Sequence, residues 1–273
     1  MDRIESAANA KIKWAASLRM RKERERRGEF IAEGIRLAEE AAAGNWPIHF
    51  CLVTEHALAD AGAQRVVTML ENKNYPIYLA TPSAYKKASA TETPQGILLV
   101  IKKKATSLVS LMTKETPLLV ILDRIQDPGN AGTILRTADA AGCTGVIASK
   151  GTVDLFSEKA VRSAMGAHFH LPIVADATYM DLALYVKKEK ISVFASTLDR
   201  KAVPYFSADY RCPAAIVFGN EGSGVSAEIS QSMPHIYIPM AGRTESLNVA
   251  AASAIILYEA FRQRHIPDSF QQR

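Results

Sequence analysis

The chain has 273 residues, of which 48% are hydrophobic, and carries 33 Lys and Arg against 28 Asp and Glu. No apolar run approaches the roughly 20 residues that a membrane-spanning helix needs, and the first five residues lack the apolar core of a signal peptide. Three isolated cysteines, Cys51, Cys143 and Cys212, show no Cys-x-x-Cys spacing, so they indicate buried thiols rather than a disulfide framework or a metal site. We therefore expect a cytoplasmic globular protein of two domains, without a metal.

The positive charge lies in the front of the chain. Residues 1–116 hold 18 Lys and Arg against 13 Asp and Glu, whereas residues 117–273 hold 15 of each. The densest cluster places six cations within nine residues: Arg19, Arg21, Lys22, Arg24, Arg26 and Arg27. Such a cluster suits a phosphate backbone. Because Glu23 and Glu25 are interspersed at helical spacings, it equally describes an exposed helix with ion pairs along it.

The front of the chain predicts a small α/β domain over residues 1–107. Residues 9–43 have a helical pattern, with breaks expected at Gly28 and Gly34. Strands are predicted at 49–53, 76–79 and 96–100, and a helix at 64–72. The polar segment 108–116 is the expected linker.

The second domain is predicted to span residues 117–273. Residues 118–122 form a near-continuous apolar run, which is typical of a strand buried on both faces of a parallel sheet. Further strands are expected at 145–148, 191–195, 214–218 and 236–238, with helices between most of them, so the fold class is α/β with helices on both faces of the sheet. His168-Phe169-His170 alternates as at a strand end, and the histidines show no metal-binding spacing.

Ligands of such sheets collect at the carboxyl ends of the strands, and one loop there leads into a helix. Asp127-Pro128-Gly129-Asn130 is turn chemistry, and the helix that follows has an apolar face of Ile134, Leu135, Ala138 and Ala141. Asn130 is a candidate N-cap. Arg136, about two turns further, could grip a phosphate, although a capped helix with a surface arginine explains the same pattern.

Two more stretches follow predicted strands. Gly219-Asn220-Glu221-Gly222-Ser223-Gly224 has Gly-x-x-Gly-x-Gly spacing, which fits neither dinucleotide-binding folds nor P-loops and could be a tight turn or a close approach to a ligand. Ser246-Leu247-Asn248-Val249 opens a helix rich in small residues, with Ser246 placed as its N-cap.

These three stretches, taken in order and spacing, resemble the three motifs of the SpoU/TrmH family of SPOUT RNA methyltransferases. The first runs from Leu122 to Arg136, the second from Ile216 to Gly224 and the third from Ile238 to Val249. The front resembles that family's substrate-binding domain through residues 26–37 and 93–96. The resemblance implies a parallel sheet with a trefoil knot and a homodimer with active sites at its interface.

The resemblance also implies methyl transfer from S-adenosyl-L-methionine to a ribose 2′-hydroxyl of structured RNA, with ribosomal RNA (23S rRNA) favoured over transfer RNA. A non-catalytic RNA-binding or ribosome-assembly protein stays the alternative from another class. The cofactor-binding positions that it implies are Gly219, Ile238, Leu247, Thr197 and Met240, and the polar active-site positions are Arg136, Asn130, Glu221, Ser246 and Asn248. Arg162, in another segment similar to the family, is implied to assist phosphate binding.

A guanidinium is an awkward general base because its pKa lies above about 12. We therefore expect Arg136 to fix a phosphate or polarise the 2′-oxygen, while Ser246 and Asn248 orient the nucleophile. Water or the RNA phosphate would accept the proton.

Overall fold

The computed structural model describes residues 1–111, 115–199, 202–231 and 233–266, and the chain divides into two compact units. The first unit holds residues 1–105 and 156–169, and the second holds residues 106–155 and 170–273. Residues 156–169 thus pack with the front of the chain, although the sequence places them inside the expected second domain. The domain limits themselves stay a prediction.

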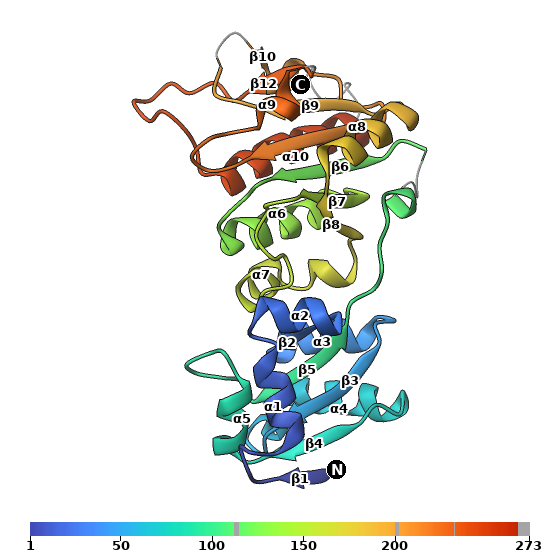
Figure 1. Cartoon of the computed structure of the whole chain (residues 1–273), viewed down its shortest axis with the longest axis vertical. Helices are drawn as coiled ribbons and strands as arrows, with labels where there is room; N and C mark the ends of the chain where they lie inside the picture. The colour runs from blue at the N-terminus through green and yellow to red at the C-terminus, as the bar shows by residue number, and fades with distance from the viewer. Residues whose placement is uncertain (112–114, 200–201, 232, 267–273) are drawn as a thin grey trace. The chain divides into compact units, whose positions relative to one another are not determined.

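The first unit is built around a five-stranded sheet in the order β1-β4-β3-β5-β2 (Figure 1). β1, β4 and β3 are parallel, whereas β5 runs antiparallel to both β3 and β2. Its elements are β1 (Asp2–Ile4), α1 (Ala10–Ser17), α2 (Arg21–Arg27), β2 (Glu29–Glu33), α3 (Ile35–Ala43), β3 (Ile48–Val53), α4 (Ala61–Asn72), β4 (Ile77–Ala80), α5 (Pro82–Ala88), β5 (Ile97–Lys102) and α7 (Glu158–Ala164), with short 3₁₀ helices at Ala57–Ala59 and Ala167–Phe169.

The prediction that residues 9–43 are helical is wrong in the middle of that stretch, where β2 forms a strand. Gly28 ends α2 in the left-handed conformation (φ 65°), which reverses the chain, and Phe30 and Ile31 then pair with β5. The expected strand end at His168-Phe169-His170 is also wrong, since residues 167–169 form a 3₁₀ helix.

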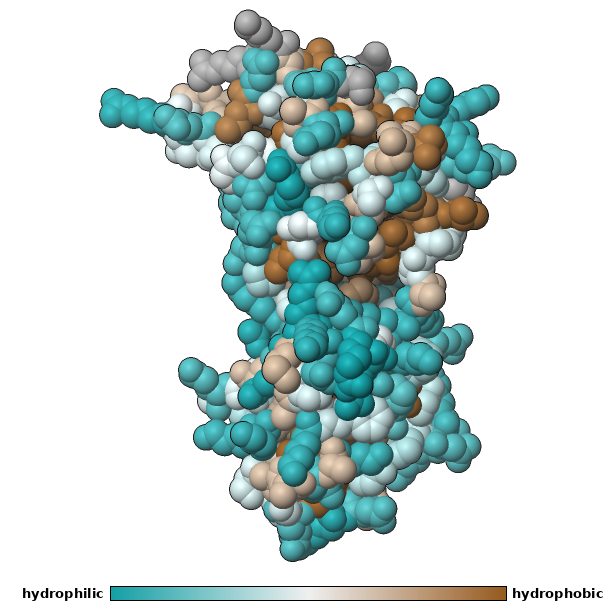
Figure 2. Space-filling view, in the orientation of Figure 1, coloured by the Kyte–Doolittle hydropathy of each residue, from teal (hydrophilic) through white to brown (hydrophobic). Residues whose placement is uncertain are grey.

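The cationic cluster of α2 has two roles. Arg24 is buried and donates from Nη1 to the carbonyls of Leu18 (2.6 Å) and Arg19 (2.7 Å), so it closes the end of α1. Arg26, which is exposed, and Arg27, which is half-exposed, both pair with the half-buried Glu23. Figure 2 shows a strongly hydrophilic surface over α2, and the cluster is therefore partly structural and partly available to a polyanion.

The second unit has a seven-stranded sheet in the order β10-β12-β9-β11-β6-β7-β8, in which every pair is parallel. The predicted α/β class with a parallel sheet is confirmed, and all five expected strands are present. β8 and β10 were not predicted. The elements are β6 (Leu118–Asp123), α6 (Pro128–Ala140), β7 (Gly145–Ser149), β8 (Ile173–Ala177), α8 (Tyr179–Lys188), β9 (Ser192–Ser196), β10 (Val203–Pro204), β11 (Ala214–Gly219), α9 (Ala227–Ser230), β12 (His235–Tyr237) and α10 (Val249–His265), with 3₁₀ helices at Leu108–Leu111 and Tyr205–Ser207.

Alternate residues of the central strands face different helices. Leu119, Ile121 and Val217 belong to one core cluster with Leu182 and Tyr185 of α8. α10 contacts both β11 and α6, and the apolar residues predicted for α6, from Ile134 to Ala141, are buried. The central strands are therefore apolar at every position because both faces of the sheet are covered.

None of the helices in the described parts of the chain is both long enough and apolar enough to cross a membrane. Cys51 and Cys143 are buried, and burial raises the pKa of the Cys51 thiol, as expected for inert thiols. Cys212 is half-exposed, so the expectation of burial is wrong for this residue.

One arginine near the end of α10 holds the start of the sheet. Arg264 donates from Nε to the carbonyl of Tyr210 and from its two terminal nitrogens to the carbonyls of Thr116 and Cys212, each at 2.7 Å, and to Pro117 at 3.2 Å. Burial lowers the pKa of this guanidinium from its usual value, but four acceptors surround it.

We predict that Arg264→Met lowers the free energy of unfolding by about 2–3 kcal/mol, because it leaves part-buried carbonyls without donors. Arg211→Met removes a solvent-exposed pair with Asp209 and should cost less than about 1 kcal/mol. Urea unfolding followed by circular dichroism checks both values. Equal losses in the two variants would contradict the assigned role of Arg264.

Candidate active site

The helix α6 begins with a proline, and this determines which residue caps it. Pro128 occupies the first helical position, and Asp127 Oδ1 accepts from the backbone N–H of Asn130 at 2.9 Å. Asp127 is therefore the N-cap, and the expectation that Asn130 caps this helix is wrong. The physical consequence is that the Asn130 side chain is free for other contacts.

Glu221, in the loop after β11, binds the start of α6. Its Oε1 accepts from Asn130 Nδ2 at 3.0 Å and from the backbone N–H of Asp127 at 3.1 Å, and its Oε2 accepts from the N–H of Gln126 at 3.1 Å. Partial burial opposes ionisation, but these hydrogen bonds outweigh it and lower the pKa of Glu221 below its ordinary value. The carboxylate is thus ionised at neutral pH.

Asn248 joins the third predicted stretch to the other two. Its Nδ2 donates to Asn130 Oδ1 at 3.0 Å, while its Oδ1 accepts from the N–H groups of Ala250 (2.9 Å) and Ala251 (3.3 Å). Asn248 therefore caps α10, and the expectation that Ser246 does so is wrong. Both ends of the Asn130 amide are now engaged, so Glu221, Asn130 and Asn248 form one chain of hydrogen bonds.

The glycine-rich loop is held by its own asparagine. Asn220 Oδ1 accepts from the N–H groups of Gly222 and Ser223, both at 2.9 Å, and Asn220 Nδ2 donates to the Arg124 carbonyl at 3.0 Å. A Cβ atom at Gly219 would lie 2.2 Å from the backbone of Gly224 and of Val225. Glycine is required at 219 because two backbone segments pass each other there.

Asp123 was not among the predicted site residues, although its hydrogen bonds connect several segments at the carboxyl edge of the sheet. It ends β6 and is fully buried. Its Oδ2 accepts from the Ser226 N–H at 2.7 Å, and its Oδ1 accepts from Ser149 Oγ at 3.1 Å and Tyr179 Oη at 3.0 Å. A charged residue closing an apolar strand was the signal that could have identified it, since a buried carboxylate requires donors.

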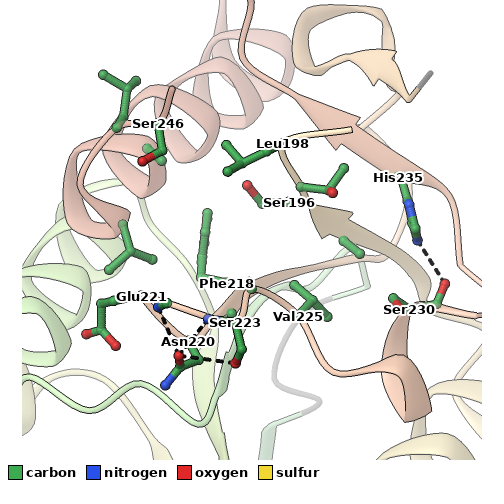
Figure 3. Close-up of a pocket in the computed structure, with 18 of the residues that line it drawn as sticks. Ser196, Leu198, Phe218, Asn220, Glu221, Ser223, Val225, Ser230, His235 and Ser246 are labelled. Atoms are coloured by element: carbon green, nitrogen blue, oxygen red, sulfur yellow. Dashed lines mark hydrogen bonds between the residues drawn. The ribbon is translucent and has the colours of Figure 1, made fainter. Parts of the chain in front are cut away.

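A cavity of about 490 Å³ lies beside this network, at the ends of β9 and β11. Figure 3 shows Ser196 and Leu198 on one side of it, the loop with Asn220, Glu221 and Ser223 below, and Ser246 opposite His235. Of the predicted residues, Thr197, Gly219, Glu221, Ser246, Leu247 and Asn248 line it. Ile238 and Met240 are not among the lining residues.

Neither of the two predicted arginines belongs to the hydrogen-bonded network of Glu221, Asn130 and Asn248 in the described residues. Arg136 is exposed on α6, six residues after Asn130, which places it about 120° around the helix from Asn130. Within the described residues it makes no hydrogen bond or ion pair. Arg162 is exposed on α7, in the first unit. Within the second unit, the site therefore brings together Asn130, Glu221 and Asn248, and Arg136 lies outside their hydrogen-bonded network.

We predict that Glu221→Gln destabilises the second unit by about 1–3 kcal/mol at pH 7, because a glutamine amide presents N–H groups where the carboxylate accepts three. Since the pKa of Glu221 is lowered, its contribution is complete above the ordinary glutamate pKa and is lost as the pH falls through the lowered value. Unfolding of wild type and variant from pH 7 to pH 3 measures this, with the exposed Glu228→Gln as control. A difference that does not shrink at acid pH would contradict it.

The chain is similar in sequence to curated proteins whose activities are named. The curated relatives include the 23S rRNA (guanosine(2553)-2′-O)-methyltransferase RlmP of Bacillus subtilis, 36% identical over 94% of this chain and 98% of the relative. They also include the 23S rRNA (uridine(2479)-2′-O)-methyltransferase of Streptomyces viridochromogenes, 31% identical over 95% of this chain and 92% of the relative.

The solved structures agree over nearly the whole length. The AdoMet-bound rRNA methyltransferase of Sinorhizobium meliloti has a TM-score of 0.86 at 30% identity, covering 97% of this chain and 98% of that chain. The SpoU methyltransferase AviRb of Streptomyces viridochromogenes, in complex with AdoMet, has a TM-score of 0.83 at 31% identity, covering 93% and 98%.

Two family models match the chain. Residues 9–99 match the MRM3-like substrate binding domain, and residues 117–258, which hold the whole polar network and the cavity, match the SpoU rRNA methylase family. The resemblance inferred from the motifs is confirmed: the chain belongs to the SpoU rRNA methylase family.

Proposed function

We propose that the protein transfers a methyl group from S-adenosyl-L-methionine to a ribose 2′-hydroxyl of ribosomal RNA, with 23S rRNA as the substrate. The observation that carries this proposal is the hydrogen-bonded chain of Glu221, Asn130 and Asn248, two of whose members line the cavity. The activities named for the relatives, both acting on 23S rRNA riboses, support the choice of substrate.

The cavity suits the cofactor. Its volume of about 490 Å³ lies within the usual range for small-molecule sites, about 300–1,000 Å³. The loop from Gly219 to Val225 lines the cavity, where its glycines allow a ligand to approach the backbone closely, and Leu198 and Leu247 supply apolar contact, which together fit a nucleoside with an amino-acid tail. S-adenosyl-L-methionine supplies an electrophilic methyl group at this place.

We propose Gly219, Leu247 and Thr197 as cofactor contacts because they line the cavity. Ile238 and Met240 stay in the proposal as backbone contacts, and they would reach the cofactor only if the exposed segment 241–248 closes over it.

The remaining residues must position a poor nucleophile. A ribose hydroxyl has to be held in line with the methyl group and must lose its proton. Both polar atoms of Asn248 are already engaged, so its role is to orient Asn130, while the exposed Ser246 is free to meet the ribose. Glu221 is a weak base because its pKa is lowered, so it holds the loops, and water or an RNA phosphate takes the proton.

We propose that Arg136 fixes an RNA phosphate at the active site of a second copy. Arg136 lies about 120° around α6 from Asn130, so it faces away from its own network. A homodimer would bring it to the partner's site and would cover the exposed Ala251 and Tyr258 of α10. We also propose that the protein acts in the cytoplasm, because the relatives named for 23S rRNA come from bacteria, whose ribosomes assemble there.

Asn130→Ala should lower kcat/KM for methyl transfer by about 10²-fold, the usual cost of removing one oriented polar group from an active site. The assay follows tritium from labelled cofactor into 23S rRNA transcripts, which are then digested so that the label is assigned to 2′-O-methylnucleosides. Thr133→Ala, one turn along on the exposed side of α6, is the matched control and should keep wild-type rates. Label in a base, or no transfer by wild type, would refute the proposed reaction and leave the non-catalytic alternative.

Mixing Asn130→Ala and Arg136→Ala proteins tests the dimer. If Arg136 acts across the interface, the mixed dimer has one intact site, and an equimolar mixture should regain about a quarter of wild-type activity. No recovery after subunit exchange, verified with differently tagged chains, would place Arg136 and Asn130 in the same site.

A further inference from the structure

The first unit carries an aromatic surface flanked by cations, well separated in sequence from the catalytic motifs. It consists of Lys11 and Trp14 of α1, Arg27 at the end of α2, His49 of β3 and Tyr78 of β4, and we call it the Trp14 surface. The Lys11 ammonium lies 5.3 Å from the Trp14 ring centre and 5.5 Å from that of Tyr78, and the Arg27 guanidinium carbon lies 5.1 Å from the Trp14 ring. All five side chains are half-exposed.

The Trp14 ring is fixed in place from below. Its Nε1 donates to Glu29 Oε2 at 2.6 Å, and the Glu29 side chain is only 7% exposed. His49 Nε2 lies 3.1 Å from the other oxygen of Glu29, and the buried Phe50 meets the indole edge-on at 5.4 Å. The left-handed turn at Gly28 brings both Arg27 and Glu29 to this ring. Arg27 lies over the ring face, and Glu29 contacts the ring edge at Nε1.

The charges leave a net positive face around the indole. Two acids contact this surface: Glu29 is buried and accepts from the indole N–H, and Glu23 is shared between Arg26 and Arg27, whereas Arg27 and Lys11 remain partly open to solvent. Lys102 pairs with Glu29 in the β2–β5 register, so it leaves the same face of the sheet, and it is exposed. A planar guanidinium lying on an indole offers its outer plane to another flat group, and lysines beside it suit phosphates.

We infer that the Trp14 surface binds one unpaired nucleobase of the RNA substrate, stacked on the Arg27 guanidinium and the Trp14 indole, with Lys11 and Lys102 on the flanking phosphates. This inference rests on the proposed function only in taking RNA as the substrate. The matched substrate-binding model, residues 9–99, covers most of the surface. Stacking requires an unstacked base, so the substrate class is RNA with a bulge, loop or single-stranded end.

The two tryptophans of the chain make this testable by fluorescence, without cofactor or turnover. Trp46→Phe leaves Trp14 as the sole tryptophan, and Trp14→Phe leaves the buried Trp46. A twelve-residue oligoadenylate should quench Trp14 emission and leave Trp46 emission unchanged, whereas a twelve-base-pair RNA duplex should quench neither. Binding is followed in parallel by polarisation of the labelled RNA, so that quenching is read only at saturation.

Conservative variants of Arg27 distinguish the contribution of its charge to RNA binding from the contribution of stacking. Arg27→Gln and Arg27→Lys should both weaken oligoadenylate binding by about tenfold, since stacking on an aromatic platform typically contributes that much. Arg65→Gln, which removes an exposed cation paired with Glu39 on other helices, should change it by less than about twofold. Circular dichroism verifies folding of each variant.

Unquenched Trp14 at saturating oligoadenylate, equal quenching by the duplex, or full binding by Arg27→Lys would overturn the inference. Because these readouts need no methyl transfer, they can fail while the enzyme methylates RNA. Conversely, an inactive enzyme would leave them unaffected.

Discussion

The carboxylate of Glu221 is the acceptor on which the arrangement of the loops beside the cavity depends. Three N–H donors from the start of α6 converge on it across 91 to 95 residues of chain, and Asn130 extends the contact to Asn248, another 118 residues away in sequence. Because the donors belong to a helix N-terminus, the helix dipole also favours the negative charge. One ionised side chain therefore holds three segments together beside the cavity, and the low pKa is a consequence of that role.

The sheet below makes this arrangement rigid. Parallel strands end at one edge, so β6, β9 and β11 deliver their loops to the same place, and the buried Asp123 joins the end of β6 to Ser149, Tyr179 and Ser226. Burial raises the pKa of Tyr179, so its hydroxyl stays protonated and donates. Loops that are anchored to the sheet can hold a ribose hydroxyl near its reaction geometry. No conformational entropy is then lost in ordering these loops at each turnover.

The central strands could be predicted because they are apolar at every position, and the order of the three motifs was enough for the family. The predictions that were wrong depend on contacts between distant segments, which the pattern of residues along the sequence does not show. β1 and β10 are very short, and β2 follows a helical charge pattern that concealed it. The caps of α6 and α10 were assigned two or three residues away, although Asp before Pro128 is a usable signal. That Arg136 faces away from Asn130 follows from helix geometry alone, whereas the contacts of Glu221 required the fold.

We propose that substrate choice and chemistry are divided between the two units: the front unit presents cations and a fixed indole, and the second presents the cavity and the hydrogen-bonded chain of Glu221, Asn130 and Asn248. The central claim is that this site methylates a 23S rRNA ribose. Its most direct test maps 2′-O-methyl groups over the rRNA of a strain that lacks the gene. One 23S position should lose its mark, regain it with the wild-type gene, and fail to regain it with Asn130→Ala. An unchanged map, or restoration by Asn130→Ala, would contradict the account.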